Sequence, residues 1–120
     1  MRTFIILFFA LISTLLHSQE WKTIYESSGF LKTPSYTETI SYCYKLSEAS
    51  PIASMTNIGI SPQGREIPMM IIDRDGLTDS QQIRAKGRII VLIQACIHAG
   101  EPDGKDAMLT FLRDLLIEKK

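Results

Sequence analysis

Residues 88–105 read RIIVLIQACIHAGEPDGK and contain the strongest fold signal of the chain. The apolar run 89–93 is rich in Ile and Val, and its short length predicts a strand that is buried on both faces. The strand ends near His98, and a helical pattern begins after Pro102. Because open α/β sheets place their chemistry at the carboxyl ends of strands, the polar residues between these two elements form the candidate site.

His98 and Glu101 lie three residues apart in this turn, so both side chains can reach one ion. Zinc accepts imidazole nitrogen and carboxylate oxygen, and its catalytic sites combine three protein ligands with a water molecule. The sequence therefore predicts His98 and Glu101 as metal ligands. The spacing alone is a weak motif, and a histidine at a strand end is often an ordinary packed residue. Cys96 alternates onto the same strand face, but a buried thiol without a ligand role is the simpler interpretation.

The rest of the sequence predicts helices and strands from its apolar periodicity and its turn residues. The expected elements are a helix from Tyr36 that ends before Pro51, strands over 55–60 and 67–73, a short helix through Ala85 capped by Thr78 or Asp79, and a helix over 103–117. Met108, Phe111, Leu112 and Leu115 recur in the last helix at the spacing of a buried face. Strands alternating with helices in this way predict an α/β fold.

Residues 1–18 have the features of an export signal. Arg2 supplies a positive charge, and the apolar stretch 4–16 fits the ~7–15 residues of a signal-peptide core but is shorter than the ~20 of a spanning helix. We expect cleavage after Ser18, a periplasmic or extracellular protein, and no stable membrane anchor once the leader is removed. An uncleaved anchor is the alternative. Cleavage would leave His98 as the sole histidine.

The composition is that of an ordinary globular protein, with 45% hydrophobic and 22% charged residues. Thirteen basic residues balance thirteen acidic ones, so no basic footprint indicates a nucleic-acid partner. The two cysteines, Cys43 and Cys96, are too few to be a disulfide framework.

The string HAGEPDGKDA at 98–107 resembles the zinc-binding segment of the zinc metallocarboxypeptidases, the carboxypeptidase A-like family. LKTPSYTETISYCYKL at 31–46 resembles the first helix of that family, and IGISPQGREIPMMIID at 58–73 resembles its first hairpin. Residues 88–115 are similar to its third strand, metal turn and following helix. The resemblance implies a three-layer sandwich, a mixed β-sheet flanked by helices, which is incomplete in this chain. Residues 19–120 would form the N-terminal part of the catalytic domain.

The resemblance also implies a function: an exported, zinc-dependent metallocarboxypeptidase that hydrolyses the C-terminal bond of peptide substrates with a free C-terminus. One Zn²⁺ per complete site would be held by His98, Glu101 and a later histidine, and a later glutamate would act as general base. Because these later residues are expected after Lys120, no catalytic residue is assigned and the 120-residue chain alone is expected to be inactive. Many relatives carry a substrate-contacting Arg where this chain has Gly100, which leaves the preferred substrate open.

Two alternatives remain. The first is a hydrolase of the deacylase branch of the same fold, which uses a similar metal turn on N-acyl amino acids. The second is an inactive or truncated relative that binds peptide without cleaving it. A reading frame that continues with a further histidine and glutamate would favour an enzyme over the inactive relative.

Overall fold

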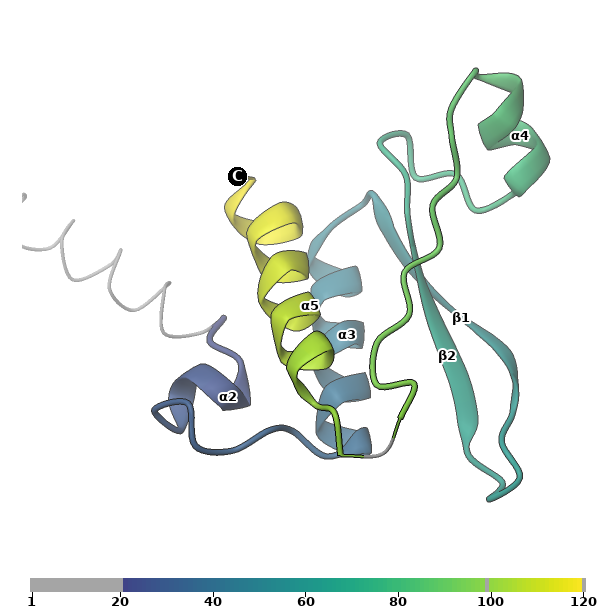
Figure 1. Cartoon of the computed structure of the whole chain (residues 1–120). Coiled ribbons are helices and arrows are strands. Elements are labelled where there is room, and N and C mark those ends of the chain that lie inside the picture. The colour runs from purple at the N-terminus through teal and green to yellow at the C-terminus, as the bar shows by residue number, and fades with distance from the viewer. Residues whose placement is uncertain (1–20, 99, 120) are drawn as a thin grey trace, which may run out of the picture. The chain divides into compact units, whose positions relative to one another are not determined.

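The computed structural model describes residues 21–98 and 100–119 (Figure 1). The chain divides into two units, Met1–Thr33 and Pro34–Lys120. The leader expected over residues 1–18 lies outside the described residues. No helix within the described part is both long enough and apolar enough to traverse a bilayer.

In the first unit, the described residues form one short helix, α2 (Ile24–Ser27). A capping box closes its start: Thr23 Oγ1 accepts a hydrogen bond from Glu26 N at 3.2 Å, and the Glu26 carboxylate accepts one from Thr23 N at 2.8 Å. These bonds satisfy two of the amide groups that have no partner inside the helix.

The second unit follows the predicted order of helices and strands except for the third strand. Its elements are α3 (Tyr36–Ala49), β1 (Ala53–Ile60), β2 (Glu66–Ile72), α4 (Ser80–Ala85), α5 (Asp103–Arg113) and the π-helical turn η1 (Asp114–Glu118). The predicted α/β class is therefore confirmed. The sheet in the described residues is a single antiparallel pair, β1 with β2.

Local sequence signals explain where α3 begins and ends. Ser35 and Glu38 form a second capping box, in which Ser35 N donates to Glu38 Oε2 at 2.8 Å and Glu38 N donates to Ser35 Oγ at 3.4 Å. Pro51 disfavours helical backbone at the preceding residue, and Ser50 accordingly has extended dihedral angles. The hairpin loop closes through Gly64, whose φ of +75° is a left-handed conformation suited to glycine.

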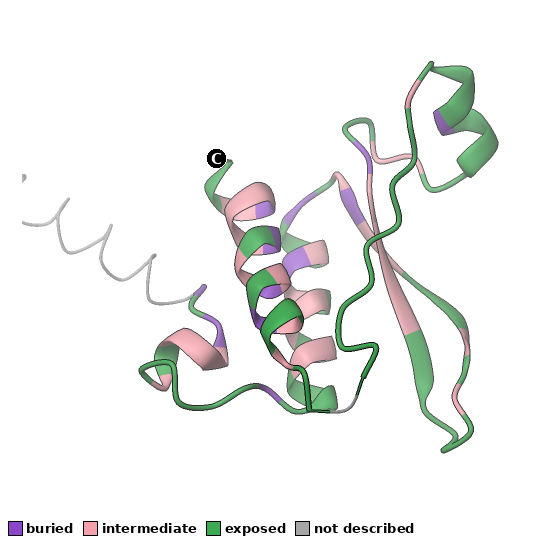
Figure 2. Ribbon diagram, in the orientation of Figure 1, coloured by how far each residue is buried: buried purple, intermediate pink, exposed green. Residues whose placement is uncertain are grey.

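The core of the second unit lies where α3 contacts β1, α5 and η1 (Figure 2). Leu46 on α3 is fully buried, and Leu109, Leu112 and Leu116 are buried on α5 and η1. Of the predicted buried face of the last helix, Leu112 is buried, Met108 and Leu115 are half-buried, and Phe111 is exposed. Apolar residues occupy a wide arc of this helix, and the packing against α3 selects the stripe one position along from the predicted one. Phe111, which was predicted to be buried, is 52% exposed.

The predicted third strand is not formed. Residues 89–98 are all exposed, with Ile89 at 90% and Val91 at 73%, and within the described part of the chain this segment has no backbone ladder with either strand (Figure 2). A strand requires a neighbour for its N–H and C=O groups, and an apolar run needs cover on both faces. The apolar pattern of residues 89–93 thus shows that the segment is suited to a buried strand. It does not show whether neighbouring strands and covering helices are present.

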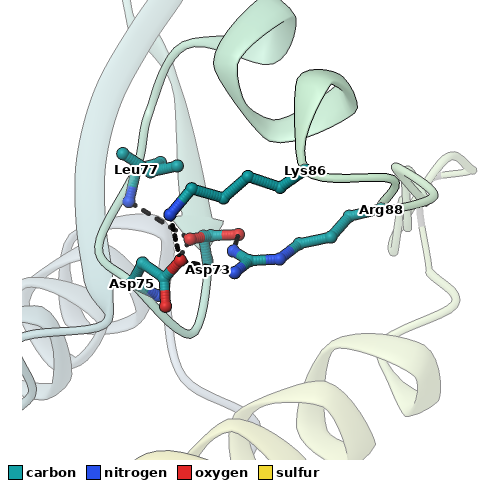
Figure 3. A network of polar contacts seen from close by, with 5 residues as sticks. All are labelled: Asp73, Asp75, Leu77, Lys86 and Arg88. Carbon is teal, nitrogen blue, oxygen red and sulfur yellow. Dashed lines mark hydrogen bonds and ion pairs between the residues drawn. The ribbon is translucent and has the colours of Figure 1, made fainter.

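Four charged side chains join the end of β2 to the start of this extended segment (Figure 3). Arg88 donates from Nη1 to Asp73 and from Nη2 to Asp75, both at 2.5 Å, and Lys86 donates to the same oxygen of Asp75. Asp73 Oδ1 also accepts the backbone N–H groups of Asp75 and Leu77. The hydrogen bond from Arg88 is the main cause of the lowered pKa of Asp73, and those from Lys86 and Arg88 lower the pKa of Asp75 to about 2.

This network predicts a pH dependence of stability. A carboxyl group whose pKa is lowered on folding stabilises the fold fully above its ordinary pKa of 3.8, and that contribution is lost as the pH falls toward about 2. Replacement of Arg88 by Ala should raise the titration midpoint of Asp75, measured by ¹³C NMR of its carboxyl carbon. Arg84→Ala, on α4 but outside the network, should leave it unchanged. An Asp75 midpoint near 3.8 in the wild type would contradict the prediction.

The buried position of Leu46 predicts a large packing effect. Leu46→Ala should reduce the free energy of unfolding by about 2–5 kcal/mol, because it removes apolar contacts and leaves a cavity. Leu31→Ala, also made in the complete protein, is a matched control, since Leu31 is 85% exposed and its truncation opens no cavity. The melting temperatures of the two variants provide the comparison. Equal melting temperatures would show that Leu46 is not part of the core.

Candidate metal centre

The predicted ligands lie on the turn between the extended segment and α5. His98 ends the segment, and Glu101 comes two residues before the first residue of α5. The backbone N–H of Glu101 donates to the carbonyl of His98 at 3.4 Å, which closes the turn. Because the chain reverses here, the two side chains project to the same place.

His98 and Glu101 face one another directly. His98 Nδ1 is 3.0 Å from Glu101 Oε2, and the two side chains are 75% and 67% exposed. A contact this exposed contributes little to stability, so stability does not explain the arrangement by itself. The distance does identify Nδ1 as the imidazole nitrogen directed at the carboxylate.

This geometry fits a zinc ion. Two ligand atoms at about 2.1 Å from a tetrahedral zinc are about 3.4 Å apart, so the observed 3.0 Å has to widen by only a few tenths of an ångström. Imidazole nitrogen and carboxylate oxygen are both zinc donors. The same arrangement of the two groups therefore allows either the hydrogen bond between them or the binding of one cation by both.

Cys96 differs from its expected state. It was predicted to be buried, but it is exposed, unpaired with another cysteine, and has a positive φ of 56°. The prediction that Cys96 is buried was wrong for the same reason as the predicted third strand: no element in the described residues covers this segment. Its thiol donates to the carbonyl of Glu101 at 3.3 Å.

A third protein ligand is not found among residues 21–98 and 100–119, where no group of three or more His, Cys, Asp or Glu side chains gathers. A catalytic zinc site takes three protein ligands, so His98 and Glu101 could supply at most two of them.

Two features that support the turn were not recognised as such from the sequence. The Lys105 ammonium group, on the first turn of α5, donates to the carbonyl of Pro34, just before α3. The two residues are 71 positions apart, and no local pattern indicates such a contact. Gly100, between the two ligands, has a φ of +89°. Here a signal was present, because glycine is the residue that turns use for positive φ.

The comparison with protein families matched residues 39–120 to the family described as zinc carboxypeptidase. Neither a curated protein nor a solved structure matched the chain. The matched range includes most of α3, the hairpin, the turn that carries His98 and Glu101, and α5. The resemblance found in the sequence is thus confirmed over more than half of the chain. The chain belongs to the zinc carboxypeptidase family.

Proposed function

We propose that the complete protein is an exported zinc metallocarboxypeptidase, which removes C-terminal residues from peptides, and that His98 and Glu101 are two of its zinc ligands. The observation that carries this proposal is the 3.0 Å approach of His98 Nδ1 to Glu101 Oε2 on an exposed turn. Family membership supports a zinc-dependent peptidase in general terms. The identity of the ligands rests on the geometry.

Each residue has a defined task in this scheme. His98 binds through Nδ1, and Glu101 binds through its carboxylate and offsets part of the charge of the cation. Glu101 is a ligand here and does not act as the base, unlike the glutamate of H-E-x-x-H enzymes. A zinc ion held by these residues would polarise the scissile carbonyl and would lower the pKa of a bound water toward ~7.

The scheme requires further residues. A third zinc ligand and a general base are needed, and we place both outside the residues that the structure describes. We also propose that residues 1–18 direct export. Determining the reading frame beyond codon 120 tests the first point directly: a further histidine and glutamate support the enzyme, whereas an immediate stop codon supports an inactive, peptide-binding relative.

In the complete protein, we expect His98→Ala to remove both zinc and peptidase activity, because a tetrahedral site that loses one of its three protein ligands binds the ion far more weakly. Zinc content measured by mass spectrometry should fall from about one per chain to near zero. Glu101→Gln should also weaken zinc binding, since it removes the negative charge and keeps the shape of the side chain.

Cys96→Ser is the control for these variants. Cys96 lies on the same turn and its thiol reaches the Glu101 carbonyl, but the proposal gives it no ligand role. Its zinc content should match the wild type. Retention of zinc at wild-type stoichiometry by His98→Ala would refute the assignment.

We further expect residues 19–120, produced alone, to lack peptidase activity and to self-associate. The exposed apolar side chains of 89–97 and their unpaired backbone groups favour pairing between copies. Analytical ultracentrifugation and a peptidase assay test this expectation. A monomer with a cooperative melt, or measurable cleavage, would contradict it.

A further inference from the structure

Helix α5 begins without the side-chain cap that opens the other α-helices of the described residues. Thr23, Ser35 and Asp79 each accept a backbone N–H from the first turn of α2, α3 and α4, respectively. The residue at the corresponding position of α5 is Pro102, and no side chain caps this helix. A cap therefore does not contribute to holding the start of α5 in place.

The Lys105 ammonium group supplies a contact of another kind at this point. It lies on the first turn of α5 and donates to the carbonyl of Pro34, the residue before the N-cap of α3. Pro34 is buried and Lys105 is half-buried, and a hydrogen bond from a charged donor is stronger there than in open solvent. Helices α3 and α5 are in contact and begin at the same end (Figure 1), so this bond joins their starts.

The charge of Lys105 is unfavourable for the helix that carries it. The N-terminus of a helix is the positive end of its macrodipole, which favours acidic residues such as Asp103 and disfavours a lysine. Helix formation therefore does not explain a lysine at this position. The contact with Pro34, which lies 71 positions away in the chain, does explain it.

Glu101 is separated from α5 by one residue with little backbone freedom. Pro102 has φ −76° and ψ −16°, and its carbonyl accepts the N–H groups of Lys105 and Asp106 at 3.0 and 3.1 Å. The proline ring itself restricts φ. Because Pro102 is bonded into the first turn of the helix, the backbone of Glu101 follows any movement of the start of α5.

The extended segment that ends at His98 approaches the same turn of α5. A Cβ added to Gly104 would be 3.7 Å from the Cβ of Ala95, which is an ordinary van der Waals distance. A displacement of the start of α5 would therefore change its position relative to this segment, and with it the separation of His98 and Glu101.

We propose that Lys105 is a positioning residue for the metal centre: by holding the start of α5 against the start of α3, it keeps the Glu101 carboxylate where it can share one ion with His98. This inference rests on the proposed function, since it concerns the same zinc site. Lys105 acts through Glu101, and its ammonium group is not itself a ligand.

The test measures zinc affinity in the complete protein by competition with a chromophoric chelator. Lys105→Met removes the ammonium group and keeps an unbranched side chain. It should weaken zinc binding about tenfold, at the lower end of the effects known for groups that orient a metal ligand. Lys105→Arg keeps a cationic donor and should bind zinc more tightly than Lys105→Met.

A double variant tests whether Lys105 acts through Glu101. In the Glu101→Gln background the charged ligand is already lost, so adding Lys105→Met should weaken zinc binding much less than it does in the wild type. Such non-additivity is expected only of residues that act on the same interaction.

Lys86→Met is the matched control. It removes an ammonium group that bonds to Asp75, in the network at the end of β2 and away from the proposed ligands in sequence. The substitution and the kind of bond lost are the same as in Lys105→Met. Its zinc affinity should match that of the wild type.

The outcomes are distinct. If the wild type binds zinc and His98→Ala does not, but Lys105→Met binds as tightly as the wild type, the inference about Lys105 is overturned and the proposed function stands. The inference is also overturned if Lys86→Met loses as much affinity, if Lys105→Arg binds no better than Lys105→Met, or if the loss is equal in the Glu101→Gln background. A complete wild-type protein that binds no zinc overturns both.

Discussion

The packing of α5 against α3 is the constraint on which the second unit depends. Leu46 is fully buried on α3, and α3 contacts α5 and η1, whose buried leucines are Leu109, Leu112 and Leu116. The start of α5 is fixed in turn by the Lys105 bond to the Pro34 carbonyl. Glu101 lies two residues before that start, so the position of the carboxylate depends on helix packing as well as on the turn.

The proposed ligands are thus held with unequal firmness. Glu101 is tied to a packed helix, whereas His98 is attached to a segment exposed over its whole length. Preorganised sites use supporting contacts to hold each ligand near its working geometry. Within the described residues, that support is present for the carboxylate, and the imidazole is held mainly by the turn itself and by the carboxylate opposite.

Local signals in the sequence predicted most of the elements correctly. The Ser35 and Asp79 caps, Pro51 and the loop around Gly64 are signals within a few residues of the elements they delimit, and the structure places the helices and the hairpin accordingly. The prediction of the third strand was wrong because a strand forms only beside neighbouring strands. Those neighbours can be distant in the chain, and the apolar pattern of the segment itself does not show whether they are present. The buried face of α5 was predicted one position away from the observed one, because apolar residues cover so much of this helix that the pattern fits more than one stripe.

For the candidate site, the three-residue spacing of His98 and Glu101 was enough to predict that their side chains lie together. The Lys105 contact that supports their turn joins residues far apart in the sequence, so no local pattern predicts it.

The clasp made by Arg88 with Asp73 and Asp75 has an evolutionary consequence. It joins the two ends of an excursion that contains α4, and within that excursion Lys86 bonds to Asp75 and Ile83 is buried. Changes of length between Leu77 and α4 should therefore leave the entry into the extended segment in place, as long as these two residues are kept. Gly76 marks the limit of that freedom, because an added Cβ there would lie 2.8 Å from the Pro51 carbonyl oxygen.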